Sequence, residues 1–148
     1  MNLKELTVVI VSFKSDEKII HCIESIHKET PVVVVENSNN KNFKLKIENT
    51  FKNVNCFLAG ENKGYSTANN IGLKYVETKY ALVLNPDTIL HKSAIKNFFS
   101  TTLRIQDFWL IGPANDQMIN LDFTDDNLKE VNNLKGFAIF FNMSKFKD

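Results

Sequence analysis

The segment Leu6–Phe13, with the sequence LTVVIVSF, decides the fold class. It is a continuous apolar run rich in β-branched residues. Such runs are typical of a strand that is buried on both faces, as in a parallel sheet. Similar short runs follow at Val32–Val35, Val54–Leu58 and Tyr80–Leu84. All four segments are therefore predicted to be strands inside the protein, in a sheet that needs helices on both faces to cover it.

The segments between these strands have features of helices. Ser15 can act as an N-cap, and isoleucines recur at helical spacing after it. Further helices are expected at Lys41–Lys52, Tyr65–Val76 and Ser93–Leu103, and further strands at Phe108–Ile111 and Phe137–Phe141. This alternation predicts an α/β fold over residues 1–148, a single domain with a mainly parallel central sheet and helices on both faces.

Composition limits the function classes. The chain has 148 residues, of which 43% are hydrophobic and 24% charged, as in an ordinary globular domain. The net charge is only +1, which gives no electrostatic footprint for nucleic acid. No apolar run reaches the length of a membrane span, and no signal peptide precedes the first strand. Cys22 and Cys56 stand in no CxxC motif and are expected to be buried free thiols, so a cytoplasmic location is predicted.

Several well-known site motifs are absent from the sequence. There is no GxGxxG after the first strand, which argues against a nicotinamide-binding domain. The segment Gly60–Gly64 lacks the GK[ST] of a P-loop, and no GxSxG elbow occurs. His21 and His27 are six residues apart and cannot share a helix face, while His91 stands alone. All three histidines are therefore expected at the surface or in ordinary hydrogen bonds.

Polar side chains follow each of the first four predicted strands. Ligands of parallel α/β sheets bind beyond the carboxyl ends of the strands. Pro86 ends strand pairing, so Asp87 is expected at the sheet edge, where one carboxylate and a diphosphate can hold Mn²⁺ or Mg²⁺. The other candidate binding residues at strand ends are Ser12, Phe13, Glu36, Asn37, Lys63, Gly64 and Asn85.

These residue types suit a nucleotide ligand. Glu36 can accept the imide N–H of uracil or thymine, and Asn37 and Ser38 can bond ribose or backbone. Phe13 can stack on a base and Lys63 can face a phosphate. Gly64, with Ala68 and Gly72, forms a stripe of small residues that permits close approach of either the sheet or a nucleotide. Each feature alone also fits a bland interpretation as a turn, a solvated lysine or a core aromatic. Four such features at four strand ends carry more weight than any one.

Five segments resemble the N-terminal part of glycosyltransferase family 2 enzymes, which have the GT-A fold, and most closely the rhamnosyltransferase-type branch. They are VVIVSFKS (Val8–Ser15), VVVVENSNN (Val32–Asn40), NKGYSTANNIGLKY (Asn62–Tyr75), ALVLNPDTIL (Ala81–Leu90) and LKGFAIFFN (Leu134–Asn142). The resemblance implies an inverting enzyme that transfers a sugar from a UDP- or dTDP-sugar to a saccharide or lipid-linked acceptor in polysaccharide biosynthesis. It places Phe13 near the base, Glu36 where the family has a base-contacting Asp, and Asp87 as the ligand of Mn²⁺ or Mg²⁺.

The chain also departs from the family pattern. Glu36 is one methylene longer than the usual Asp, and Asn85 replaces the first acid of the metal element. The family's general base follows a strand like Leu134–Asn142, after which only six residues remain, so the catalytic base is unassigned. The candidate substitutes are Asp122, Asp125 and Asp126, whose bland interpretation is a solvated loop.

Two further hypotheses therefore stay open. The chain can be a non-catalytic nucleotide-sugar-binding module, or a subunit completed by a partner chain such as a second copy in a homodimer. A nucleotidyltransferase is less well supported, because the segment Ser12–Ser15 is not a Gly-rich basic loop. Peripheral association with the inner face of the membrane is compatible with a lipid-linked acceptor.

Overall fold

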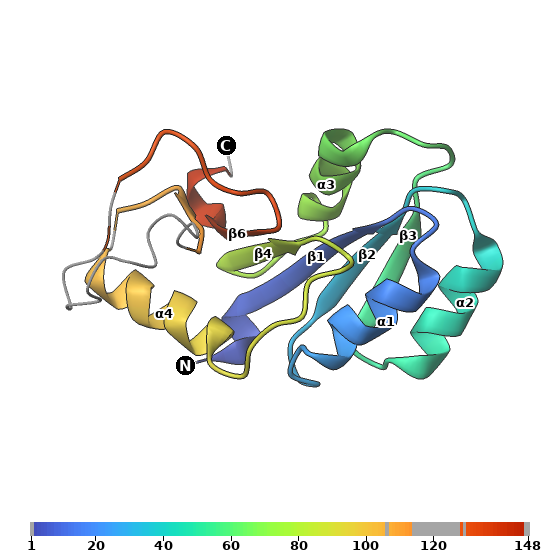
Figure 1. The fold of residues 1–148 in the computed structure, drawn as a ribbon, viewed down its shortest axis with the longest axis horizontal. Helices are drawn as coiled ribbons and strands as arrows, with labels where there is room; N and C mark the ends of the chain where they lie inside the picture. Colours follow the sequence, from blue (N-terminus) through green and yellow to red (C-terminus); the bar gives the residue numbers. More distant parts are fainter. Residues whose placement is uncertain (1, 106, 114–127, 129, 147–148) are drawn as a thin grey trace.

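The computed structural model describes residues 2–105, 107–113, 128 and 130–146 (Figure 1). Within these residues the strands form one six-stranded sheet in the order β3-β2-β1-β4-β6-β5. The strands are β1 (Leu6–Ser12), β2 (Val32–Glu36), β3 (Val54–Leu58), β4 (Tyr80–Leu84), β5 (Leu110–Ile111) and β6 (Ala138–Asn142). The first four are parallel, whereas β6 runs antiparallel to β4 and to β5. The predicted mainly parallel α/β sheet is confirmed.

Helices cover both faces of this sheet. They are α1 (Asp16–Glu24), α2 (Lys41–Thr50), α3 (Tyr65–Leu73) and α4 (Ala94–Arg104), with the short 3-10 segments η1 (Leu3–Glu5) and η3 (Met143–Lys145). Figure 1 shows α1, α2 and α4 on one side of the sheet and α3 on the other. The core clusters agree, because α1, α2 and α4 pack on one set of strand residues and α3 on the alternate set.

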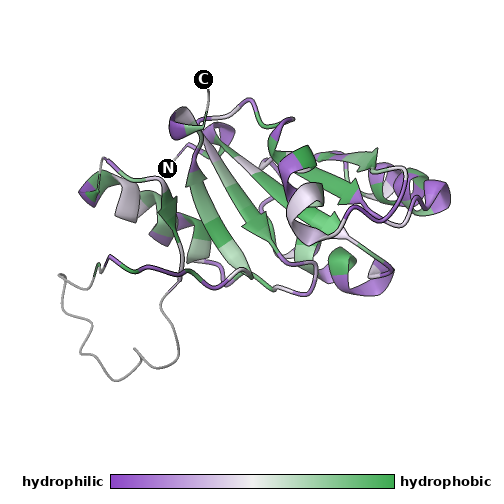
Figure 2. Cartoon of the chain, turned by 90° about the horizontal axis from the view of Figure 1, so that it is seen from above, coloured by the Kyte–Doolittle hydropathy of each residue, from purple (hydrophilic) through white to green (hydrophobic). Residues whose placement is uncertain are grey.

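Strand β1 is buried along its whole length, which explains its uninterrupted apolar sequence. Val8 and Ile10 belong to the core beneath α1 and α4, whereas Val9 and Val11 face the side of α3. Figure 2 shows the central strands as mostly hydrophobic, whereas the helices carry both hydrophilic and hydrophobic residues. Complete burial of each such side chain contributes about 1.5–3 kcal/mol to folding. The strand is therefore firmly held in the core, and the residues at its carboxyl end start from a fixed backbone position.

Helix α3 lies unusually close to the sheet. A Cβ atom added at Gly72 would lie 2.5 Å from Val9 Cγ1 and 3.1 Å from Val35 Cγ2. Ala68, one turn earlier, is also fully buried. Gly64 differs, because its position is open and its φ of 76° belongs to the left-handed region that favours glycine. The small-residue stripe therefore serves packing on the sheet at two positions and opens to solvent at the third.

The outer edge of β3 is covered by two charged side chains of α2. Glu48 Oε1 accepts a hydrogen bond from the Cys56 amide at 2.8 Å and from Lys44 Nζ at 2.6 Å, and Lys44 Nζ also donates to the Cys56 carbonyl. Burial raises the pKa of Glu48, but the bonds from Lys44 and Cys56 and the Lys44 charge outweigh it and lower that pKa. The two side chains thus pair with the Cys56 amide and carbonyl, which on an edge strand have no neighbouring strand to bond.

Element boundaries differ from the prediction in a few places. Strand β1 ends at Ser12, because Phe13 is followed by Lys14 with a φ of 52°. Ser15 stands at the N-cap of α1 without a capping hydrogen bond; its hydroxyl instead lies 3.1 Å from that of Ser12. The insertion of antiparallel β6 between β4 and β5 was not predicted.

Candidate functional site

The strand order creates a switch point between β1 and β4. The chain passes from β1 to β2 and β3 on one side, then crosses to β4 on the other side of β1. In sheets of this kind the crevice beyond the carboxyl ends of the strands at the switch point is the usual ligand site. The segments after β1 and β4 border it, and α3 approaches from one face.

At the end of β1, the structure separates Ser12 from Phe13. Ser12 is fully buried, and its carbonyl accepts a hydrogen bond from the Asn37 amide at 2.8 Å. Phe13 is 43% exposed, with Lys14 Nζ 5.5 Å from its ring centroid. It borders a cavity of about 580 Å³ at the start of α1, which Ser38 and Asn40 also line. Phe13 is therefore not a core residue, and its ring is available to a planar ligand.

At the end of β2, the carboxylate of Glu36 is fully buried in its own turn. It accepts hydrogen bonds from the Ser38 amide at 3.1 and 3.2 Å, from the Ser38 hydroxyl, and from the Asn40 amide at 2.5 Å. Asn39, between those donors, has a φ of 60°. A turn accounts for every contact of this side chain. The expected contact with a nucleotide base would require this buried carboxylate to become accessible, and it stays a prediction.

Asn37 links β2 to the loop before α3. It is 2% exposed, and its side-chain nitrogen Nδ2 donates to Asn62 Oδ1 at 3.1 Å and to the Gly64 carbonyl at 3.5 Å. Its Oδ1 accepts from the Lys63 amide at 2.9 Å, and Asn62 Oδ1 accepts from the Gly64 amide at 2.9 Å. Both ends of the Asn37 side chain are thus used to fix this loop. The predicted ribose contact has no support in this geometry.

The loop held by Asn37 leads into the first turn of α3. Gly64 is the N-cap, and no side chain caps this helix. Its amide groups and its dipole therefore form a positive end, which suits an anion. The Lys63 ammonium forms an ion pair with Glu61, and this bond and charge lower the pKa of the Glu61 carboxyl. A phosphate at Lys63 would compete with Glu61.

At the end of β4, Asn85 and Asp87 lie in a turn. The Thr88 amide donates to the Asn85 carbonyl at 3.1 Å, while α4 begins only at Ala94, so Asp87 is not its cap. Asp87 is exposed, and among the described residues its carboxylate has no hydrogen bond or salt bridge. The Cys22 thiol donates to the Asn85 carbonyl at 3.6 Å; burial, with the nearby charge of Asp87, raises the pKa of Cys22 to about 12.

The oxygen atoms of this turn suit a divalent cation that is bound jointly by the protein and by the phosphates of a ligand. Across the part of the chain that the structure describes, no three His, Cys, Asp or Glu side chains gather as a metal site. Mn²⁺ or Mg²⁺ is commonly held by one or two carboxylates with phosphate oxygens and water completing the shell. The free carboxylate of Asp87 and the amide oxygen of Asn85 fit that arrangement rather than a cage made of protein alone.

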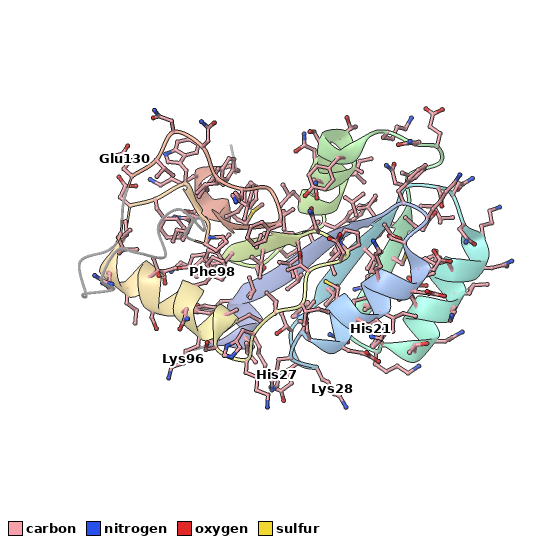
Figure 3. All side chains as sticks on the ribbon, in the orientation of Figure 1. His21, His27, Lys28, Lys96, Phe98 and Glu130 are labelled. Carbon is pink, nitrogen blue, oxygen red and sulfur yellow. The ribbon has the colours of Figure 1, made fainter. Side chains whose placement is uncertain are left out.

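The histidines lie elsewhere. Figure 3 shows His21 on α1 and His27 in the segment that follows, apart from each other, and both are exposed. His21 Nδ1 lies 3.2 Å from a Glu24 oxygen. His91, also exposed, lies 2.8 Å from the Ser93 hydroxyl. The predicted surface positions are confirmed.

Tyr65 is a site residue to which the sequence assigned no role. It is the first residue of α3, and its hydroxyl lies 2.8 Å from Asn85 Oδ1 and 3.0 Å from the Gly136 carbonyl. With Asn85, Gly136 and Phe137 it lines a second cavity of about 510 Å³. Its position directly after Gly64 in the segment Asn62–Tyr75 was the one available signal. Asp122, Asp125 and Asp126 lie outside the described residues.

The family model described as "Glycosyl transferase family 2" matches residues 7–138. This chain belongs to glycosyl transferase family 2. Two curated relatives support the membership. The chain is 31% identical over 102 residues to the low-salt glycan biosynthesis hexosyltransferase Agl10 of Haloferax volcanii, a match covering 66% of this chain and 33% of that protein. It is 31% identical over 101 residues to a teichoic acid poly(glycerol phosphate) polymerase of Staphylococcus epidermidis, covering 63% of this chain and 14% of that protein.

Solved structures confirm the GT-A fold expected of a family 2 chain. S. aureus TarS 1–349 in complex with UDP-GlcNAc superposes with a TM-score of 0.72 at 17% identity, over 94% of this chain and 46% of the TarS 1–349 chain. The mannosyltransferase PcManGT of Pyrobaculum calidifontis, in complex with GDP-Man and Mn²⁺, gives 0.73 at 12% identity, over 96% and 46% of the two chains. The family 2 chain thus spans about half the length of these structures and a third or less of the curated relatives. No helix in its described part is long and apolar enough to cross a membrane.

Proposed function

We propose that this family 2 chain is an inverting glycosyltransferase, which transfers a sugar from a UDP- or dTDP-sugar to a saccharide or lipid-linked acceptor. One observation carries the proposal. The exposed carboxylate of Asp87 follows β4 at the switch point, and the first residue of the uncapped helix α3, Tyr65, contacts the turn that contains it. A cation ligand beside a helix N-terminus is a suitable arrangement for a diphosphate.

Each part of the site then has a defined task. The ring of Phe13 stacks against the base, and the amide groups at the start of α3 bond the diphosphate. Asp87 and Asn85 would hold Mn²⁺ or Mg²⁺, which would offset the negative charge that develops on the leaving diphosphate. Asn37 keeps Lys63 and Gly64 in place through the loop contacts described above. An acceptor hydroxyl attacks the anomeric carbon in line, and no general base is assigned among the described residues.

The comparisons support the donor class without naming the substrate of this chain. TarS was solved with UDP and with UDP-GlcNAc, and PcManGT with GDP-Man and Mn²⁺. The names of the curated relatives refer to glycan and teichoic acid synthesis. We therefore propose a nucleoside-diphosphate sugar, with uracil or thymine as base, and a role in surface polysaccharide synthesis.

The decisive test is calorimetric binding of UDP, dTDP, GDP and CDP with and without Mn²⁺. UDP or dTDP should bind most tightly, and Mn²⁺ should strengthen that binding. The Asp87→Ala variant should keep its fold and lose the Mn²⁺-dependent part of the affinity. Glu29→Ala, which removes an exposed carboxylate from the loop after α1, is the matched control and should behave as wild type. Unchanged Mn²⁺-dependent affinity in Asp87→Ala would refute the metal ligand, and no nucleotide binding at all would refute the function.

A second candidate is a binding module that needs a partner chain for catalysis. The observation favouring it concerns the carboxylates at the strand ends. Glu36 is buried in its turn, Glu61 is paired with Lys63, and Asp87 is the proposed cation ligand. None of the three is left to accept the proton of an acceptor hydroxyl. Binding of UDP-sugar by a monomer without turnover, and turnover only on dimerisation or addition of a partner, would favour this candidate.

A further inference from the structure

The hydroxyl of Tyr65 joins three segments that are distant in sequence. It extends from the first turn of α3 to Asn85 Oδ1 at 2.8 Å and to the Gly136 carbonyl at 3.0 Å. Asn85 and the segment before β6 are also joined directly, because the Asn85 amide donates to the Phe137 carbonyl at 3.0 Å. The phenol therefore adds a second connection between the turn after β4 and the segment leading into β6.

This arrangement has one proton for two acceptors. A phenol carries a single O–H, whereas Asn85 Oδ1 and the Gly136 carbonyl both accept. The proton is therefore shared, or it serves one acceptor at a time. If a cation or ligand takes up the Asn85 oxygen, the phenol retains Gly136 as its partner. Tyr65 can thus hold Asn85 Oδ1 in place before binding and release it without being left unpaired.

The position of Tyr65 argues against a purely packing role. The side chain is 45% exposed, and its ring lines the open cavity of about 510 Å³ instead of the core. A hydrogen bond at such an exposed site contributes little to global stability, because water can replace it. Its main physical effect is to restrict where the Asn85 amide and the Gly136 segment can lie.

We infer that Tyr65 is a positioning residue for the proposed reaction. Its hydroxyl fixes the side-chain amide of Asn85, two residues before the cation ligand Asp87, against the Gly136 segment. The expected effect on binding rests on the proposed function, because Asn85 Oδ1 affects binding only as part of the proposed cation site. The inference goes further than that function by assigning the orientation of this oxygen to a residue of α3. Pre-ordering such a ligand saves the cost of ordering it during binding.

The test compares Tyr65→Phe with Tyr75→Phe. Tyr75 is a matched control because it is 49% exposed, its ring stacks on Phe57 at 3.7 Å, and its hydroxyl has no hydrogen bond within the described residues. Two quantities are measured: hydrogen exchange at the backbone amide of Asn85, which donates to the Phe137 carbonyl, and calorimetric affinity for UDP, or dTDP if it binds more tightly, with and without Mn²⁺. Tyr65→Phe should speed the exchange and weaken the Mn²⁺-dependent binding about three- to tenfold, while the metal-free affinity stays unchanged. Tyr75→Phe should change neither quantity.

Three outcomes would overturn the inference: unchanged affinity in Tyr65→Phe, an equal loss of affinity with and without Mn²⁺, or the same loss in Tyr75→Phe. A wild-type chain that binds no nucleotide would instead refute the proposed function. In that case the exchange measurement still decides whether Tyr65 holds Asn85. Equal exchange rates in wild type and Tyr65→Phe would refute that hold, and faster exchange in the variant alone would support it.

Discussion

The sharpest prediction concerns the buried carboxylate of Glu36. The substitution Glu36→Gln keeps the size of the side chain and removes its charge. In the structure, its two oxygens accept from the Ser38 amide, the Ser38 hydroxyl and the Asn40 amide. A glutamine has one acceptor oxygen, and its amino group must face one of these donors. If the amino group takes the Oε2 position, the Asn40 backbone amide loses its acceptor. If it takes the Oε1 position, the remaining oxygen keeps both backbone amides and the amino group faces the Ser38 hydroxyl.

The size of the effect follows from those contacts. A hydrogen bond to a charged group contributes about 1.5–3 kcal/mol, and a buried donor without a partner costs about 1–3 kcal/mol. The second orientation leaves no donor without a partner, because the Ser38 hydroxyl can rotate to accept. The expected loss is then the charge assistance of these bonds, roughly 1–3 kcal/mol. This is a large share of the 5–15 kcal/mol typical of a folded domain. At this chain length each kcal/mol lowers Tm by roughly 2–4 °C.

Urea unfolding followed by circular dichroism measures the change in the free energy of unfolding. Glu24→Gln is the control, because the Glu24 side chain is 57% exposed and, among the described residues, pairs only with His21. It should stay within about 0.5 kcal/mol of wild type. If Glu36→Gln is equally close to wild type but loses preference for UDP over CDP, the turn argument is wrong and the carboxylate contacts the base.

Three further predictions concern packing, charge and thiols. Gly72→Ala should lower the free energy of unfolding by about 1–2 kcal/mol in urea titrations, since overpacking against Val9 exceeds the gain in helix propensity; a stabilised variant would contradict this close contact. Because the pKa of Glu48 is lowered by folding, its charge stabilises the protein above its ordinary pKa of 4.5 and that contribution is lost as the pH falls through the folded-state value. Glu48→Gln should therefore be less stable than wild type at pH 7, by about 0.5 kcal/mol, and the difference should vanish in acid; a constant difference across pH would count against it. Burial raises the pKa of both Cys22 and Cys56 to about 12, so a thiol reagent at pH 8 should label neither in the native protein and both after denaturation; rapid native labelling would show that the burial is wrong.

Much of the fold could be predicted because its central strands carry a strong local signal. The bounds of β3 and β4 agree with the prediction at both ends, since each is a short apolar run between polar turns. The antiparallel placement of β6 could not be predicted in the same way. Its register, with Ala138 opposite Leu84, is determined by contacts with distant strands rather than by its own sequence.

For the candidate site, the sequence indicated which residues follow the strand ends but not the direction of their side chains. Asp87 lies at the exposed strand end where the sequence places it. Glu36 also follows its strand, yet its carboxylate turns inward, because the backbone at Asn39 adopts a positive φ that brings two amides to it. Tyr65 was missed because its partners are 20 and 71 residues away in the sequence. Contacts over such separations have no local sequence pattern.

The covered edge of β3 limits how copies of this chain can associate. An open edge strand invites another chain to add a strand and extend the sheet, which leads to continuous-sheet dimers or to aggregates. Here the Lys44 and Glu48 side chains already occupy the outward amide and carbonyl of Cys56. A second molecule would have to break an ion pair and desolvate both charges before it could pair with this edge. Strand pairing with a second copy along β3 is therefore disfavoured at Cys56, and a homodimer is expected to use another surface.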